Sequence, residues 1–274
     1  MLSLVHVFNI LLPILYFIGF IAYYYDFVKE STALHNSKRI ILFLILLFHF
    51  FYLIARTIAF NHTPITGKFE IFSVLAFSIC FSYFLLELLT DVRGTGLFIL
   101  IFSLIFQVIS SVFVADNFIV PEVLRNRMLG THVISAILGY SGFTISAVYG
   151  LLYTLLYKEI KLNKFGLIFN RLPSLETLEK LSFYSVVIGF VLLSISIIIG
   201  FVWLPEAFPD FSYSDPKLIS TLAVWVIFGM AIVFKVFVHW YGKKVIKLTL
   251  FGFTIAVITI LLTNVLAKTF HAFY

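Results

Sequence analysis

Apolar residues gather into eight long stretches that short polar connectors separate. The stretches cover residues 4–25, 39–60, 70–90, 97–114, 131–157, 183–203, 218–240 and 246–267. Each is close to the ~20 residues that an α-helix needs to cross the hydrocarbon core of a bilayer. Because backbone groups in lipid must be hydrogen-bonded internally, stretches of this length indicate helices and not barrel strands. The pattern predicts an all-α, polytopic membrane bundle with about eight transmembrane helices, forming a single integral membrane domain over residues 1–274.

Composition supports this prediction. The chain is 62% hydrophobic and only 12% charged, whereas soluble domains carry about 25% charged residues. The first apolar stretch has no basic segment before it and no small-residue cleavage site, so we expect a retained helix and not a signal peptide. Cys80 is the only cysteine, which excludes an internal disulfide and chemistry by a thiol pair.

The basic residues predict an orientation. The odd-numbered connectors hold twelve Lys and Arg residues, and the even-numbered connectors with the C-terminal tail hold five. Since basic loops stay in the cytoplasm, both termini are expected outside, together with His62, His132, the 204–217 loop and His271. The net charge of +6 is then explained by orientation and not by nucleic-acid binding. The expected location is the bacterial inner (cytoplasmic) membrane.

The connector 158–182 is the longest predicted cytoplasmic element. Four leucines recur in it at a spacing of three, which predicts a short helix on the membrane surface with Ser174 as its cap. For these leucines we favour ordinary amphipathic packing over a role in docking a partner protein. They are Leu172, Leu175, Leu178 and Leu181.

Three histidines have positions that suggest chemistry. His49 falls in the middle of the second stretch, where an ionisable group is a functional candidate. For His49 we favour a neutral imidazole that is hydrogen-bonded to a neighbouring helix. His132 opens the fifth stretch and His271 closes the eighth. Neutral imidazole is a strong axial ligand of haem iron, so the pair can sandwich a haem, although each alone is also typical of a membrane interface.

The external loop after the sixth stretch is rich in aromatic residues. Its rings can stack on a porphyrin, or they can lie in the headgroup zone as an aromatic belt. Lys217 and Arg56 can meet haem propionates as cations. The four aromatic residues are Trp203, Phe208, Phe211 and Tyr213.

These segments carry a family resemblance. The loop resembles the tryptophan-rich signature of the cytochrome c assembly family, which includes CcsA, CcmC and HemX-type membrane proteins. The segment 131–140 resembles the family's helix start with His-Val, and Phe270-His271-Ala272-Phe273 resembles its terminal Leu-His-Ser-Tyr. The resemblance spans essentially the whole chain. The loop keeps the signature residues Gly200, Trp203, Glu206, Asp215, Pro216, Lys217 and Trp225.

The resemblance implies a function in haem handling. His132 and His271 would be axial ligands, the loop would be a haem platform, and the cofactor would be haem b held non-covalently. The family moves haem across or along the membrane for attachment to apocytochrome c. A chain without a thiol pair is not expected to be an enzyme by itself. It needs a CcsB-like or thiol-reducing assembly partner, besides membrane lipid.

Departures from the CcsA pattern favour the HemX-type branch. Phe208, Ser212 and Ser214 replace tryptophans of the CcsA type, and Val233 replaces a membrane-embedded histidine. Members of the HemX-type branch are associated with haem biosynthesis, including control of glutamyl-tRNA reductase abundance. The alternative function is therefore a regulator whose 158–182 connector contacts a haem-synthesis enzyme. A small-solute transporter is less favoured, because broken helices with convergent mid-membrane polar groups are scarce in the sequence.

Overall fold

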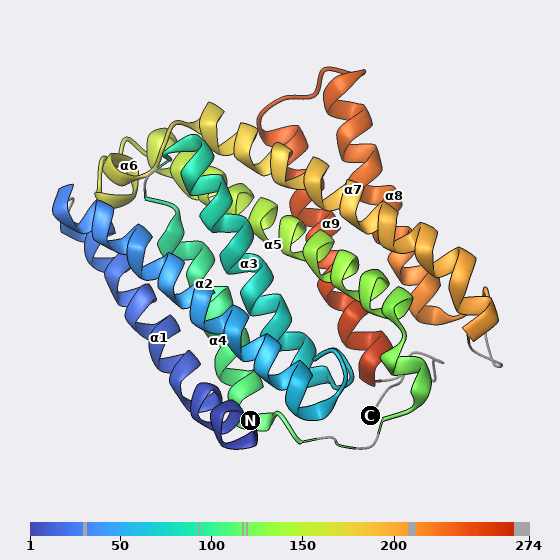
Figure 1. Ribbon diagram of the computed structural model, residues 1–274. Helices are drawn as coiled ribbons and strands as arrows, with labels where there is room; N and C mark the ends of the chain where they lie inside the picture. Colours follow the sequence, from blue (N-terminus) through green and yellow to red (C-terminus); the bar gives the residue numbers. More distant parts are fainter. Residues whose placement is uncertain (30–31, 93, 117, 119, 208–211, 266–274) are drawn as a thin grey trace. The chain divides into compact units, whose positions relative to one another are not determined.

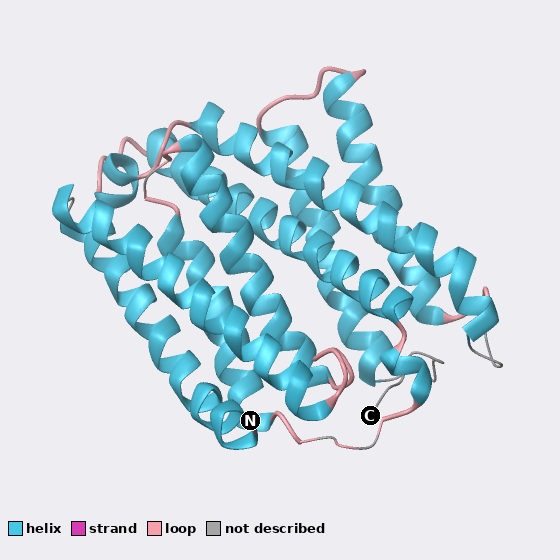
Figure 2. Cartoon of the chain, in the orientation of Figure 1, coloured by secondary structure: helices cyan, strands magenta, loops and turns pink. Residues whose placement is uncertain are grey.

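The computed structural model describes residues 1–29, 32–92, 94–116, 118, 120–207 and 212–265. Every regular element in these ranges is helical (Figure 2). Long helices follow one another through short connectors (Figure 1). The elements are α1 (Leu2–Lys29), α2 (Thr32–Phe60), α3 (Lys68–Thr90), α4 (Gly96–Phe113), the 3-10 turn η1 (Glu122–Arg125), α5 (Arg127–Lys161), α6 (Leu167–Arg171), α7 (Leu175–Ala207), α8 (Pro216–Val236) and α9 (Lys243–Val265).

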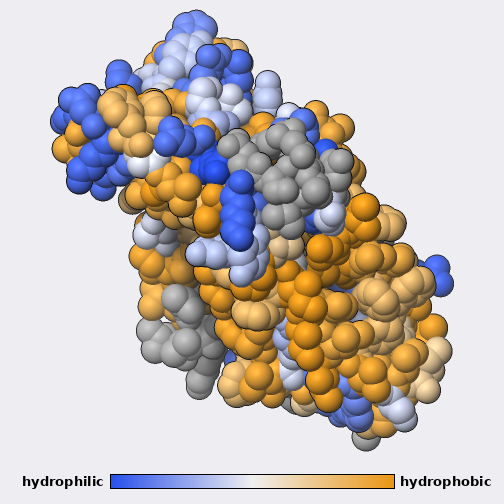
Figure 3. Space-filling view, turned by 90° about the vertical axis from the view of Figure 1, so that its left-hand side faces the viewer, coloured by the Kyte–Doolittle hydropathy of each residue, from blue (hydrophilic) through white to orange (hydrophobic). Residues whose placement is uncertain are grey.

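The predicted all-α membrane bundle is confirmed. Within the described residues, seven helices (α1 to α5, α7 and α8) are long and apolar enough to cross a membrane, and α9 corresponds to the eighth predicted stretch. The face shown in Figure 3 is mainly hydrophobic, with hydrophilic residues gathered mainly toward its upper end. Large apolar side chains such as Ile10 and Ile40 are more than 60% exposed. Such a surface suits contact with lipid tails and not with water.

The helices group into two compact units. Unit 1 comprises residues 1–133 and 170–172, and unit 2 comprises residues 134–169 and 173–274. In unit 1, α1 packs against α2, α2 against α3, α3 against α4, and α4 against α1. This closed sequence of neighbours, joined by short connectors, is the arrangement of an up-and-down four-helix bundle. The prediction of one integral membrane domain over residues 1–274 stays a prediction.

Both ends of the unit 1 bundle hold buried ion pairs. At one end Lys38 lies 2.5 Å from the Asp26 carboxylate and 3.3 Å from that of Glu87, and the Tyr23 hydroxyl donates to Glu87. At the other end the Arg56 guanidinium pairs with Glu70. Because an unpaired charge is costly inside a membrane, the pairing explains how these residues are accommodated in apolar helices.

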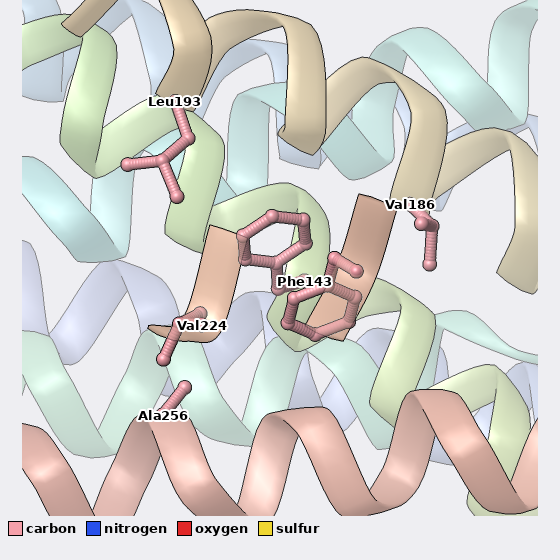
Figure 4. Close-up of a cluster of buried hydrophobic side chains, with 6 residues drawn as sticks. Phe143, Val186, Leu193, Val224 and Ala256 are labelled. Carbon is pink, nitrogen blue, oxygen red and sulfur yellow. The ribbon is translucent and has the colours of Figure 1, made fainter. Parts of the chain in front are cut away.

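Unit 2 is held by close helix packing. A Cβ added to Gly142 of α5 would lie 2.9 Å from the Ser185 carbonyl oxygen of α7, so only glycine allows this approach. Beside this contact the rings of Phe143 and Phe228 stack with centroids 3.7 Å apart (Figure 4). Lipid tails are as apolar as the core, so packing contacts of this kind, and not the hydrophobic effect, stabilise membrane helices.

The predicted surface helix within 158–182 is wrong in its extent. Residues from Leu175 onward are the first turns of the 33-residue α7, and only Leu167–Arg171 form a short separate helix, α6. Leu172, Leu178 and Leu181 are all less than 10% exposed, so they pack inside the protein and do not face a membrane surface. The predicted cap is confirmed, because the Thr177 amide donates to the Ser174 hydroxyl over 3.2 Å.

Candidate functional site

The aromatic segment begins within α7. Residues 204–207, predicted as the start of the loop, are the last residues of this helix, and Trp203 just before them is half-buried. Phe208 and Phe211 lie outside the described residues. The chain continues with a turn in which the Ser214 amide donates to the Ser212 hydroxyl and the Asp215 amide to the Ser212 carbonyl. The helix extends beyond residue 203, where the sixth apolar stretch was predicted to end, because its residues stay apolar up to Pro205.

Asp215 fixes the start of α8. Its Oδ1 accepts from the Lys217 amide over 2.8 Å and from the Leu218 amide over 3.3 Å, and Pro216 occupies the first helical position. A carboxylate at this place satisfies amides that have no partner within the helix and interacts favourably with the helix dipole. Asp215 is therefore the N-cap of α8. The capped turn gives the adjoining aromatic residues a fixed support.

Tyr213 is the most exposed of the described aromatic residues of the segment. Tyr213 is 62% exposed, and its ring stacks on that of Phe201 with centroids 5.9 Å apart and an interplanar angle of 21°. Exposed stacked rings near a membrane surface fit a planar apolar ligand as well as a headgroup zone. The side chains present are therefore compatible with a porphyrin.

His132 lies early in α5. The helix begins at Arg127, where the Met128 amide donates to the Asn126 side chain over 2.8 Å. His132 is half-buried. The other proposed ligand, His271, lies outside the described residues. The joint ligation of haem iron by the two histidines stays a prediction.

Arg56 is already engaged within unit 1. It is 2% exposed, and its Nε donates to Glu70 over 2.8 Å while its NH2 group donates to the Ala115 carbonyl over 2.6 Å. Its guanidinium also lies 3.7 Å from Asp116 and stacks over the Phe60 ring. A propionate would have to share Arg56 with these groups, and the propionate role of Arg56 stays a prediction.

His49 belongs to a polar chain that the sequence analysis did not identify. The Tyr16 hydroxyl lies 2.9 Å from Nδ1 of His49, and Nε2 lies 3.0 Å from the Ser73 hydroxyl. The expected hydrogen bonding of His49 to neighbouring helices is confirmed. The Ser73 hydroxyl in turn donates to Gln107, so that polar groups from all four helices of unit 1 converge. The signal in the sequence is a polar residue on the buried stripe of each apolar helix.

Comparison with known proteins agrees with the resemblance. The family described as Cytochrome C assembly protein matches residues 9–271. The chain is 28% identical over 238 residues to the cytochrome c biogenesis protein CcsA of Guillardia theta, covering 80% of this chain and 79% of the relative. It is 26% identical over 260 residues to CcsA of Heterosigma akashiwo, covering 82% and 80%. A CcsA from Synechocystis sp. is 35% identical over 103 residues, covering 38% of this chain and 31% of the relative. The chain belongs to the cytochrome c assembly protein family.

Proposed function

We propose that this multi-pass membrane protein handles haem during cytochrome c assembly. The observation that carries the proposal is the family match over residues 9–271, which includes both candidate ligands. The relatives named CcsA support a role in cytochrome c biogenesis. In this proposal the chain delivers haem at the external face of the inner membrane and does not act as an enzyme by itself.

The residues that would hold haem have separate tasks. His132 and His271 would hold the haem iron through their imidazoles, and haem would supply the iron porphyrin that is attached to apocytochrome c. Trp203 and Tyr213 offer rings on which the macrocycle can stack, and Asp215 positions the turn that carries Tyr213. Phe208 and Phe211 are proposed to bind haem as well.

The proposal requires partners. Haem attachment needs an apocytochrome c with reduced thiols, and Cys80, the only cysteine, is fully buried. A reductant must therefore come from a second protein, either a CcsB-like or a thiol-reducing assembly partner. Partner binding at the external face is the natural consequence of this division of tasks.

The second candidate is a HemX-type regulator of haem biosynthesis. The absence of histidine at Val233 and of tryptophan at Phe208, Ser212 and Ser214 favours it. A regulator would act through its cytoplasmic side on glutamyl-tRNA reductase levels. Glu176 is the suitable probe of that side, because its side chain is 75% exposed and pairs with Lys180 of its own helix.

One paired experiment separates the two functions. If the protein handles haem, Asp215→Ala removes the N-cap and destabilises the start of α8 by about 1 kcal/mol. This variant is then expected to lower both the amount of bound haem and the yield of holocytochrome c. The matched surface variant Glu176→Lys leaves both unchanged. For a regulator the ranking inverts, and Glu176→Lys alters haem-precursor levels while Asp215→Ala has no effect. If neither variant changes haem occupancy, holocytochrome c or precursor levels, both functions have been assigned to the wrong segments.

A further inference from the structure

The turn between α8 and α9, at the top of Figure 1, is held by Glu179 of α7. The Glu179 carboxylate accepts from the Gly242 amide over 2.8 Å and from the Lys235 ammonium group. Gly242 has a φ of +59°, a conformation that favours glycine. The Trp240 amide donates to the Phe234 carbonyl over 3.0 Å, and the two rings pack with centroids 4.6 Å apart. These contacts give the turn a defined conformation.

The same turn presents large apolar side chains outward. Phe237 is 75% exposed, Val238 is 51% exposed and Tyr241 is 60% exposed. They follow directly after α8, which is long and apolar enough to cross a membrane. Exposed apolar and aromatic side chains at the end of such a helix suit the zone where the acyl chains meet the headgroups. The turn is therefore placed to contact lipid.

Three lysines stand in the first turns of α9, beside the apolar turn. All three are exposed, and they are Lys243, Lys244 and Lys247. The Lys243 ammonium lies 3.6 Å from the centroid of the Tyr157 ring, and that of Lys244 lies 5.9 Å from the centroid of the Trp240 ring. An aromatic face attracts a cation but carries no net charge to neutralise it. The start of α9 is thus a compact positive surface.

This positive charge stands where the helix itself does not favour it. The amides at a helix N-terminus carry partial positive charge, so lysines there destabilise the helix and acidic residues stabilise it. The first turn of α9 has no acidic residue, whereas that of α7 has Glu176. Among the described residues, the ion pairs at this end of unit 2 are formed by Lys180 and Lys235. An anion from outside the protein would provide the counter-charge that the start of α9 needs.

We propose that the α8–α9 turn and the start of α9 bind the headgroup of an anionic phospholipid. The ammonium groups of Lys243, Lys244 and Lys247 contact the phosphate oxygens. The exposed apolar side chains of the turn contact the glycerol and the upper acyl chains. A lipid fits better than a soluble acidic protein, because the apolar side chains lie directly at the end of a membrane helix. This binding is separate from haem handling, since it uses none of the proposed haem-binding residues.

Native mass spectrometry of the full chain in detergent tests the proposal. Phosphatidylglycerol and phosphatidylcholine with the same acyl chains are added in equal amounts, and the mass identifies each bound lipid. Wild-type protein is expected to prefer phosphatidylglycerol. Lys243→Gln with Lys244→Gln is expected to lower that affinity at least about tenfold, because each lysine near an anionic lipid surface contributes roughly a fivefold factor. Lys243→Arg with Lys244→Arg keeps the charge and is expected to keep the affinity.

A matched control separates a binding site from diffuse charge. Lys164→Gln with Lys180→Gln removes the same charge from exposed positions of unit 2 outside the turn, and it is expected to keep the affinity. The proposal is overturned if wild type binds both lipids equally, or if the control loses as much affinity as the glutamine pair. Displacement of the lipid by an equal concentration of inorganic phosphate would contradict it too, by assigning the site to a free anion. Melting temperatures show whether the variants are folded, and Lys247→Gln replaces the glutamine pair if that pair unfolds.

Discussion

Removing the Glu70 carboxylate is expected to destabilise unit 1 strongly. Glu70 accepts from Arg56 over 2.8 Å, from the amide and hydroxyl of Thr66 over 2.9 and 2.7 Å, and from the Gly67 amide over 3.2 Å. In Glu70→Ala the Arg56 guanidinium stays buried without its main counter-ion, at a cost of about 3–5 kcal/mol. Since 1 kcal/mol lowers the melting temperature of a chain of this size by roughly 2–4 °C, we expect a fall of about 10 °C.

Cys80 provides the assay. It is the only cysteine, it lies in α3 of the same unit, and its side chain is fully buried. A dye that becomes fluorescent on reaction with a thiol therefore reports the opening of unit 1 as purified protein is heated in detergent. The control is Glu176→Ala, because exposed ion pairs contribute at most about 1 kcal/mol.

A double variant isolates the cause. The double variant Arg56→Met, Glu70→Leu removes the buried charge together with its counter-ion. It is expected to regain most of the melting temperature that Glu70→Ala loses. The reasoning fails if Glu70→Ala melts within about 2 °C of wild type, or if the double variant melts below the single one. Either result would mean that the ion pair does not control the stability of this bundle.

Two further predictions concern packing and topology. A Cβ at position 142 would lie 2.9 Å from the Ser185 carbonyl oxygen, and Gly142→Leu adds further atoms there. This variant is therefore expected to lower the free energy of unfolding by about 1–3 kcal/mol, measured by thermal unfolding. Gly166→Ala, whose Cβ has only a side-chain oxygen at 3.6 Å, is expected to leave the melting temperature unchanged. Reporter fusions after Lys164 are expected to be cytoplasmic and fusions after Asp210 external, and the opposite result would contradict the charge count.

Local features of the sequence predicted local structure well. The apolar stretches predicted the long helices, and the caps at Ser174 and Asp215 follow from side chains that bond amides two or three residues away. The extent of α7 was harder to predict. Leucines at a spacing of three give the same pattern on a surface helix as on the buried start of a membrane helix, and only tertiary packing distinguishes the two.

Long-range polar pairing was not predictable from the sequence. Arg56 is a single cation in an apolar segment and Lys38 stands just before one, and nothing local identifies Glu70 or Glu87 as the partner of either. These pairs form because four antiparallel helices bring their buried stripes together. For the candidate site, the sequence indicates residue types that are suited to binding haem. Whether these residues bind one haem together depends on where the fold places them, as it does for the ion pairs.

The absorption spectrum of the purified protein tests haem handling most directly. Protein produced in cells supplied with haem is predicted to show a Soret band. The band is predicted to be lost or shifted in His132→Ala and in His271→Ala, and to be kept in His239→Ala, because only the first two imidazoles are proposed to bind iron. A wild-type protein that stays colourless despite the haem supply would contradict the account.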